Sequence, residues 1–216
     1  MDRHSMMEEL NAFMANSRFP WAVCGGFALD LFLNKNIRTH SDIDICVFER
    51  DRDCVLQYML DADWTVYEFR GQGKVRLLGA NTPSDPGRNF MCLKDDCDIV
   101  KFYPCEEDGQ LYHQFFHTGM KKFYYLEFLF NRVHGEYLVL DQEKGLRRKL
   151  SQAILVRNGI PYLAPEIALL YKASNAEKTD YQFDFEQVFP HLSDNQKAWF
   201  VHGLKTLYPN GHAWDR

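Results

Sequence analysis

The sequence predicts an α/β protein of the α+β type, in which a small mixed β-sheet with flanking helices precedes a mostly helical C-terminal part. Three observations lead to this prediction. Residues 41–48 are read as a strand because polar and apolar side chains alternate from Asp42 to Ile45, with the period of a strand. Apolar residues recur at helical spacing over residues 27–33. Beyond residue 150 strand-like runs give way to helical patterns, so we expect two regions, 1–150 and 151–216.

Length and composition fit a folded protein that needs no disulfide or metal to build its core. The chain has 216 residues, of which 46% are hydrophobic and 25% charged, and this excludes a disordered, collagen-like or coiled-coil chain. Its formal net charge is -5, with 25 Lys and Arg against 30 Asp and Glu. Proteins that bind nucleic acid by counterion release carry a basic surplus, so we do not expect a nucleic-acid partner.

The N-terminal segment and the cysteines favour a cytoplasmic protein with free thiols. The first ten residues are charged and lack the apolar region of a signal peptide, and no apolar run approaches membrane-spanning length. We therefore expect six reduced cysteines and no membrane partner. A metal site built from Cys97, Cys105, His113 and His117 is the alternative, but it lacks the close cysteine pairs of structural zinc sites.

Local patterns place the elements of the first 80 residues. A capping-box pattern at residues 5–8 opens a first amphipathic helix. A short apolar run over 21–24 meets Gly25-Gly26, and the following helix stops near Asn34. After the strand at 41–48, the sequence predicts a helix over 51–60 and strands over 64–69 and 74–78.

The remaining elements follow from turn residues and from apolar runs. Turn chemistry predicts a loop over 81–87. We expect a hairpin in which residues 134–135 turn a strand into its partner. Pro165 suits the first turn of a helix that runs through Lys172. The strands expected here cover 99–103, 123–130 and 136–140, and a last helix covers 194–207.

Two carboxylates share one face of the strand at 41–48. Residues i and i+2 of a strand point to the same side, so Asp42 and Asp44 project together while Ile43 and Ile45 face the core. Neighbouring carboxylates repel, and a divalent cation would relieve this repulsion. Ligands that offer only oxygen suit Mg²⁺, so the pair indicates a magnesium site.

Gly25-Gly26 lies at a strand-to-helix junction. Because glycines have no side chain, their backbone N–H groups can approach a phosphate closely. The N-terminus of the following helix also favours negative charge. A Gly-Gly pair alone is usually a turn, and a pair of aspartates on a strand is usually solvated. Their combination, in this order and at this distance, is far more specific.

The fuller pattern resembles a known family. Gly25-Gly26 followed by Asp42-Ile43-Asp44 is similar to the signature of the DNA polymerase β-like nucleotidyltransferase superfamily. Residues 25–33 and 38–44 resemble the aminoglycoside and lincosamide nucleotidyltransferase branch. Residues 159–172 carry a second match, and the segments at 184–185 and 212–214 follow the same style. The resemblance spans most of the chain and is weakest over residues 65–120.

The resemblance implies a reaction and its cofactors. Residues 1–150 would form the catalytic domain and 151–216 a helical region, with the acceptor bound between them. The enzyme would transfer a nucleoside monophosphate from a nucleoside triphosphate, with ATP favoured, to a hydroxyl group and release pyrophosphate. Asp42 and Asp44 would bind Mg²⁺. The triphosphate would be held by Gly25, Gly26, Ser41 and Lys172.

The family also has a third carboxylate, which binds metal and takes the acceptor's proton. Glu127 lies in an apolar strand, where a charge is costly unless it is paired or coordinated. Asp98 is the competing position, although Asp95 and Asp96 beside it indicate an acidic loop. We favour Glu127 as the third metal ligand and as general base.

The acceptor is expected to be a small hydroxylated molecule, such as an aminoglycoside- or lincosamide-like antibiotic. The alternatives are a nucleotide-binding regulator without catalysis and a toxin–antitoxin-type transferase that acts on a macromolecule. Aromatic residues between 112 and 125 could line an acceptor cleft, although such a run more often forms core. His40 is expected to steady the loop before the aspartates, Arg38 to contact phosphate or end a helix, and Asp30 to support the site or lie exposed.

Overall fold

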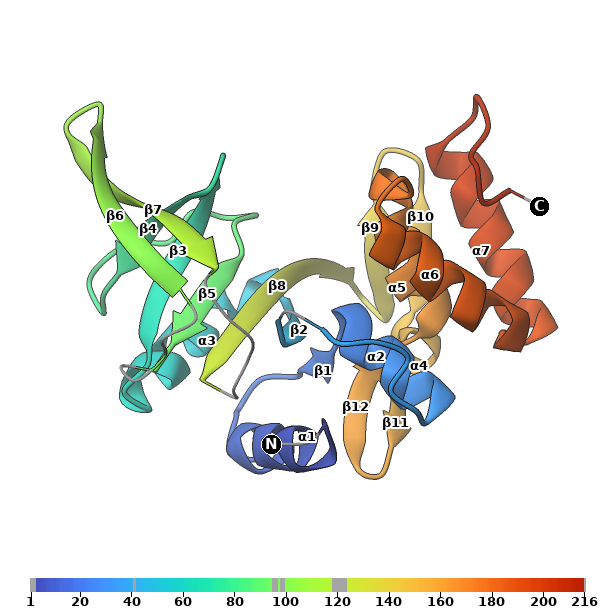
Figure 1. Ribbon diagram of the computed structural model, residues 1–216, viewed down its shortest axis with the longest axis horizontal. Helices are drawn as coiled ribbons and strands as arrows, with labels where there is room; N and C mark the ends of the chain where they lie inside the picture. Colours follow the sequence, from blue (N-terminus) through green and yellow to red (C-terminus); the bar gives the residue numbers. More distant parts are fainter. Residues whose placement is uncertain (1–2, 41, 95–96, 98–99, 118–123, 216) are drawn as a thin grey trace. The chain divides into compact units, whose positions relative to one another are not determined.

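The computed structural model describes residues 3–40, 42–94, 97, 100–117 and 124–215, without the side chains of residues 3, 4 and 117. The chain forms two compact units that interleave in sequence (Figure 1). The first unit comprises residues 1–21 and 41–131, and the second comprises 22–40 and 132–216. The regions expected from the sequence, 1–150 and 151–216, are successive segments instead, and that functional division stays a prediction.

The first unit contains a mixed sheet, as the sequence predicts. Its strands follow the order β2-β8-β5-β3-β4-β7-β6, in which β2 and β8 run parallel and the other neighbours run antiparallel. The elements are α1 (Arg3–Met14), β2 (Asp44–Phe48), η1 (Glu49–Asp51), α3 (Arg52–Asp61), β3 (Thr65–Gly71), β4 (Lys74–Leu78), β5 (Phe90–Leu93), β6 (Val100–Glu107), β7 (Gln110–His117) and β8 (Tyr125–His134), whose last three residues belong to the second unit.

Strand registers define the two faces of this sheet. One row of paired residues runs across five strands, from Asp44 to Glu127, Met91, Tyr67 and Leu77. Paired residues on neighbouring strands point to the same side, so this row defines what we call the carboxylate face. We call the other side the helix face, because α3 covers it.

A cation–π contact fixes α3 on the helix face. The Arg52 guanidinium lies 5.0 Å from the ring centroid of Phe90 and 3.9 Å from that of Phe130. Arg52 also donates to Glu49 and to the carbonyl oxygen of Arg88. Aromatic faces and oxygen acceptors therefore surround the buried guanidinium of Arg52.

The second unit combines two small β-arrangements with the C-terminal helices. Strand β1 runs parallel to β12, which pairs antiparallel with β11, while β9 pairs with the end of β8 and with β10. Helix α5 packs against α2, α6 and α7. The elements are β1 (Ala22–Val23), α2 (Gly25–Leu33), β9 (Tyr137–Asp141), β10 (Leu146–Lys149), α4 (Leu150–Ala153), β11 (Ile154–Arg157), β12 (Ile160–Leu163), α5 (Pro165–Lys172), η2 (Ala173–Asn175), α6 (Thr179–Val188), η3 (Phe189–His191) and α7 (Asp194–Leu207).

Most predicted elements are confirmed, with instructive exceptions. The predicted capping box at residues 5–8 is wrong, because helix α1 begins at Arg3 and Ser5 therefore lies inside it. Strand β2 begins only at Asp44, three residues after the start of the predicted strand, and all of its residues from Ile45 to Phe48 are buried. The six cysteines are free, as predicted. No helix in the described part of the chain is long and apolar enough to cross a bilayer.

Strands β5, β7, β10, β11 and β12 were not predicted. All four residues of β5 are buried, so it shows no alternation. The hairpin of β11 and β12 turns at Asn158 and Gly159, whose φ angles of 52° and 77° are those of a two-residue hairpin turn. The predicted helical part therefore begins at Pro165, after this hairpin.

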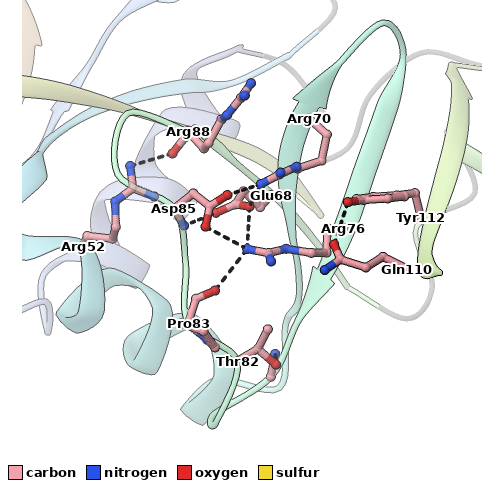
Figure 2. A network of polar contacts seen from close by, with 11 residues as sticks. Arg52, Glu68, Arg70, Arg76, Thr82, Pro83, Asp85, Arg88, Gln110 and Tyr112 are labelled. Atoms are coloured by element: carbon pink, nitrogen blue, oxygen red, sulfur yellow. Dashed lines mark hydrogen bonds and ion pairs between the residues drawn. The ribbon is translucent and has the colours of Figure 1, made fainter. Parts of the chain in front are cut away.

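A buried glutamate on β3 holds the loop between β4 and β5 (Figure 2). Glu68 is fully buried on the helix face, where Arg70 and Arg76 donate to its Oε1 at 2.9 and 2.8 Å and the Asp85 N–H donates to Oε2 at 2.6 Å. Asp85 in turn pairs with both arginines, and Arg76 also donates to the carbonyl oxygen of Pro83. One carboxylate thus fixes the loop that the turn residues predict.

Replacing Glu68 by Ala should lower the free energy of unfolding by about 3 kcal/mol, because it leaves two arginines and a backbone N–H without their buried acceptor. Urea denaturation followed by circular dichroism measures this loss. The matched control is Glu107→Ala, which breaks the exposed pair with Lys74 and should cost less than about 1 kcal/mol. Equal losses in the two variants would contradict the assigned role of Glu68.

Candidate active site

Two of the three predicted carboxylates lie side by side in the sheet of the first unit. The parallel register of β2 and β8 pairs Asp44 with Glu127, and the Glu127 N–H donates to the Ile43 carbonyl oxygen at 2.9 Å. Asp42 lies in the segment just before β2. Ile43 and Ile45 are fully buried, whereas Asp42 and Asp44 are half-buried. The acidic side chains therefore alternate with the core residues that hold the segment in place.

Burial and neighbouring charge change the acidity of Glu127. Its burial raises the pKa to about 7, against a lowering effect of the hydrogen bond that the Tyr125 hydroxyl donates, while the charge of Asp42 raises it further. The pKa of Tyr125 is raised mainly by burial, and also by Glu127, Asp42 and Asp44. A carboxyl group with a pKa near neutrality can take up and release a proton at physiological pH, which is what a general base must do.

The donor set suits a hard divalent cation. Asp42, Asp44 and Glu127 offer only oxygen atoms, which Mg²⁺ prefers. Among the described residues, however, no group of three or more His, Cys, Asp or Glu side chains is already arranged around a metal position. The alternative set of Cys97, Cys105, His113 and His117 gains no support, and the side chain of His117 lies outside the description.

The glycine pair lies at a strand-to-helix junction of the second unit, as predicted. It follows β1 and opens α2, whose N-cap residue Cys24 makes no side-chain capping hydrogen bond. Gly25 has a φ of 62°, a backbone conformation that residues with a Cβ atom rarely adopt. Gly26 lies against the ring of His40. Both positions therefore require glycine, one for its backbone angle and the other for space.

Lys172 belongs to a buried ion cluster of the second unit. Its Nζ lies 3.1 Å from Asp184 Oδ2 and 4.2 Å from the ring centroid of Tyr181. Arg38 donates two hydrogen bonds of 2.8 Å to the same carboxylate and also pairs with the exposed Asp180 at 3.3 Å. Lys172 is therefore not on a solvated helix face, and two cations share one fully buried carboxylate.

Some of the residues predicted for the site lie outside the described part of the chain, and others do not lie together. Ser41 and Asp98, like Asp95 and Asp96, lie outside the described residues. Phe123 of the predicted aromatic group also lies outside the described residues, and two of the described members separate. Phe115 packs with Phe69, whereas Phe116 is exposed beside Tyr103.

The hydrogen bond from Tyr125 to Glu127 was not predicted from the sequence. The available signal was the pattern Tyr-x-Glu in a strand, which puts both side chains on one face. The pairing of Asp184 with Lys172 was not predicted either, because nothing local in the sequence marks a partner on another helix.

A family comparison agrees with the motif at the N-terminal end. The family model of aminoglycoside-2''-adenylyltransferase matches residues 6–80, about a third of the chain. The match includes both the glycine pair and the aspartate pair. It confirms the predicted resemblance to the aminoglycoside and lincosamide nucleotidyltransferase branch over this segment. None of the curated proteins compared with the chain matches it.

Solved structures show the same fold over almost the whole chain. The crystal structure of ANT(2'')-Ia in complex with adenylyl-2''-tobramycin is 11% identical, with 94% of this chain and 97% of that one covered and a TM-score of 0.55. The solution structure of the antibiotic-resistance factor ANT(2'')-Ia is 13% identical, with coverage of 97% and 96% and a TM-score of 0.56. The lincosamide antibiotic adenylyltransferase LnuA with bound lincomycin is 13% identical, with coverage of 86% and 95% and a TM-score of 0.52. The predicted nucleotidyltransferase fold is thereby confirmed.

The raised pKa of Glu127 makes stability depend on pH. Between the ordinary value of 4.5 and about 7, the folded state binds more protons than the unfolded state, so the free energy of unfolding falls as pH rises through this window. Over the whole window the free energy of unfolding should fall by on the order of 3 kcal/mol. Urea denaturation at pH 5 and pH 8 in metal-free buffer should show a smaller loss in Glu127→Gln than in the wild type. The control Glu106→Gln, at an exposed position on β6, should behave as the wild type. A loss of equal size in Glu127→Gln would refute this account.

Proposed function

We propose that the protein is a nucleotidyltransferase that moves a nucleoside monophosphate from a nucleoside triphosphate, with ATP favoured, to a hydroxyl group of a small molecule. The observation that carries this proposal is the row in which Asp44 and Glu127 are direct neighbours on β2 and β8, with Asp42 close enough to raise the pKa of Glu127. The family match over residues 6–80 and the fold of the solved adenylyltransferases support it.

In this proposal the three carboxylates have distinct duties. Asp42 and Asp44 would hold Mg²⁺, with Glu127 as a further oxygen ligand. Bound Mg²⁺ would neutralise charge on the triphosphate and on the leaving group. Glu127 takes the proton of the acceptor hydroxyl, for which its raised pKa suits it. The Tyr125 hydroxyl donates to Glu127 and so favours its ionised form.

The reaction conserves atoms and charge in a simple way. The acceptor oxygen forms a bond to the α-phosphorus, and the bond from that phosphorus to the bridging oxygen breaks. Pyrophosphate leaves with the electron pair, and the acceptor's proton passes to Glu127. The N–H groups at Gly25 and Gly26, together with Ser41 and Lys172, are proposed to hold the phosphates.

The acceptor is proposed to be an antibiotic-like molecule with a free hydroxyl. The matching family is named for transfer to an aminoglycoside. Of the similar structures, that of ANT(2'')-Ia holds adenylyl-2''-tobramycin and that of LnuA holds lincomycin. Residues 1–150 would serve as catalytic domain and 151–216 as a helical region, in a protein of the cytoplasm. The alternative of a regulator without catalysis would gain support if no third carboxylate lay near the aspartates, and the pairing of Asp44 with Glu127 favours the transferase instead.

Replacing either Asp42 or Asp44 by Asn should abolish nucleotidyl transfer, with a loss of at least about 10³-fold, because each removes a charged metal ligand. Pyrophosphate release with ATP, Mg²⁺ and a panel of aminoglycosides and lincosamides measures the reaction. The matched control is Asp53→Asn, at an exposed position on α3, which should keep full activity. Full activity in either Asp42→Asn or Asp44→Asn would overturn the proposed function.

A further inference from the structure

The turn formed by Gly25 and Gly26 is packed against a single histidine ring. A Cβ atom placed on Gly26 would lie 2.1 Å from Nδ1 and 2.5 Å from Cε1 of His40, closer than side chains can approach. The ring therefore touches the backbone of the turn on the side where any other residue would carry its side chain. No side chain fits at Gly26, because the His40 ring occupies that position.

A buried carboxylate holds this ring in place. Asp30 lies four residues after Gly26 on α2, so the two positions share one face of the helix. His40 Nε2 donates to Asp30 Oδ2 at 3.0 Å, and the Ile37 N–H donates to Asp30 Oδ1 at 3.0 Å. Asp30 is 0% exposed and His40 5% exposed. The carboxylate thus binds both the ring and the backbone of the segment that carries it.

An aromatic ring of the same helix also packs against His40. The ring centroids of His40 and Phe27 lie 4.6 Å apart. Phe27 directly follows the glycine pair in α2, so His40 is held between Asp30, Phe27 and the turn itself. A histidine with three such neighbours has little freedom to change its rotamer.

Core packing alone explains this arrangement poorly. An apolar side chain could fill the same volume without the desolvation cost of a buried carboxylate and imidazole. The pair also joins the two parts of the nucleotidyltransferase motif along the chain, since His40 contacts the glycine turn and precedes Asp42 by two residues. These observations point to a role in shaping the turn.

We propose that His40, held by Asp30, is a positioning residue for the triphosphate: its ring fixes the backbone of Gly25 and Gly26 so that the N–H groups of the turn meet the phosphate oxygens. This inference rests on the proposed function and specifies how its phosphate subsite is built. Backbone N–H groups at a helix N-terminus recognise anionic oxygens. The contribution of His40 should therefore grow with the number of phosphates on the nucleotide.

A double-mutant cycle between His40 and Gly26 tests the proposal. Binding of ATP and of AMP is measured by calorimetry in the presence of Mg²⁺. His40→Ala should weaken ATP binding about tenfold or more and AMP binding by less than about threefold. Gly26→Ala should do the same, because its Cβ displaces the ring. In the His40→Ala background the same Gly26→Ala change should add less than about threefold, because the clashing ring is gone.

A second histidine of the same unit is the matched control. His212 Nε2 bonds to the Ala173 carbonyl oxygen at 2.9 Å, and its ring lies against Trp214 with the centroids 5.5 Å apart. His212→Ala should lower the melting temperature and leave the ratio of ATP to AMP affinity unchanged. A merely structural role of His40 would give the same pattern as His212, and that result would overturn the inference.

The possible failures are distinguishable. A wild-type protein that binds no ATP overturns the proposed function and this inference with it. A wild-type protein that binds ATP, together with a His40→Ala variant of equal affinity or a strictly additive cycle, overturns the inference alone. If His40→Ala does not fold, His40→Gln takes its place in the cycle, because it keeps a donor for Asp30 but removes the ring.

Discussion

The parallel pairing of β2 with β8 is the constraint on which the candidate active site depends. It joins a strand that starts at Asp44 to one that carries Glu127 in its middle, and the register makes the two acids direct neighbours. A slip of one residue would turn Glu127 to the helix face, since side chains alternate along a strand. The apolar partners Ile45 and Phe128, both fully buried, oppose such a slip because it would expose them.

The two faces of the sheet in the first unit handle charge differently. On the helix face, Glu68 is satisfied by two arginines and a backbone N–H, so its charge is neutralised within the protein. On the carboxylate face, Glu127 is paired with Asp44, and its pKa is raised by burial and by the charge of Asp42. The same residue type is therefore held as part of an ion network on one face and has a raised pKa on the other, according to its partners.

Local sequence patterns predict the parts of the fold that depend on nearest neighbours. Helix α2 ends at Asn34 and helix α5 begins at Pro165, and both boundaries follow from the backbone geometry that these residue types favour. Strand β5 escapes prediction because both its faces are buried, which removes the alternation. The Asn158-Gly159 pair was a usable sequence signal for the hairpin of β11 and β12, which was not predicted.

The candidate site was predictable as far as its motif is local. Asp42 and Asp44 are two residues apart, so their spacing predicts a pair, although only Asp44 lies in β2. Glu127 follows them by more than 80 residues, and only the register of β8 shows which of its side chains meets Asp44. The partners of Lys172 and His40, which are Asp184 and Asp30, depend equally on how helices pack, and no single-sequence pattern contains that information.

The interleaving of the two units has a consequence for how this chain can vary. The chain passes from one unit to the other after residues 21, 40 and 131, so each unit is assembled from two separate stretches of sequence. A recombination event with one breakpoint, wherever it falls, splits at least one unit between two parents. The glycine turn and the aspartate pair, which lie close in sequence but in different units, would be inherited together by almost every such recombinant, while the pairing of β2 with β8 would often be broken.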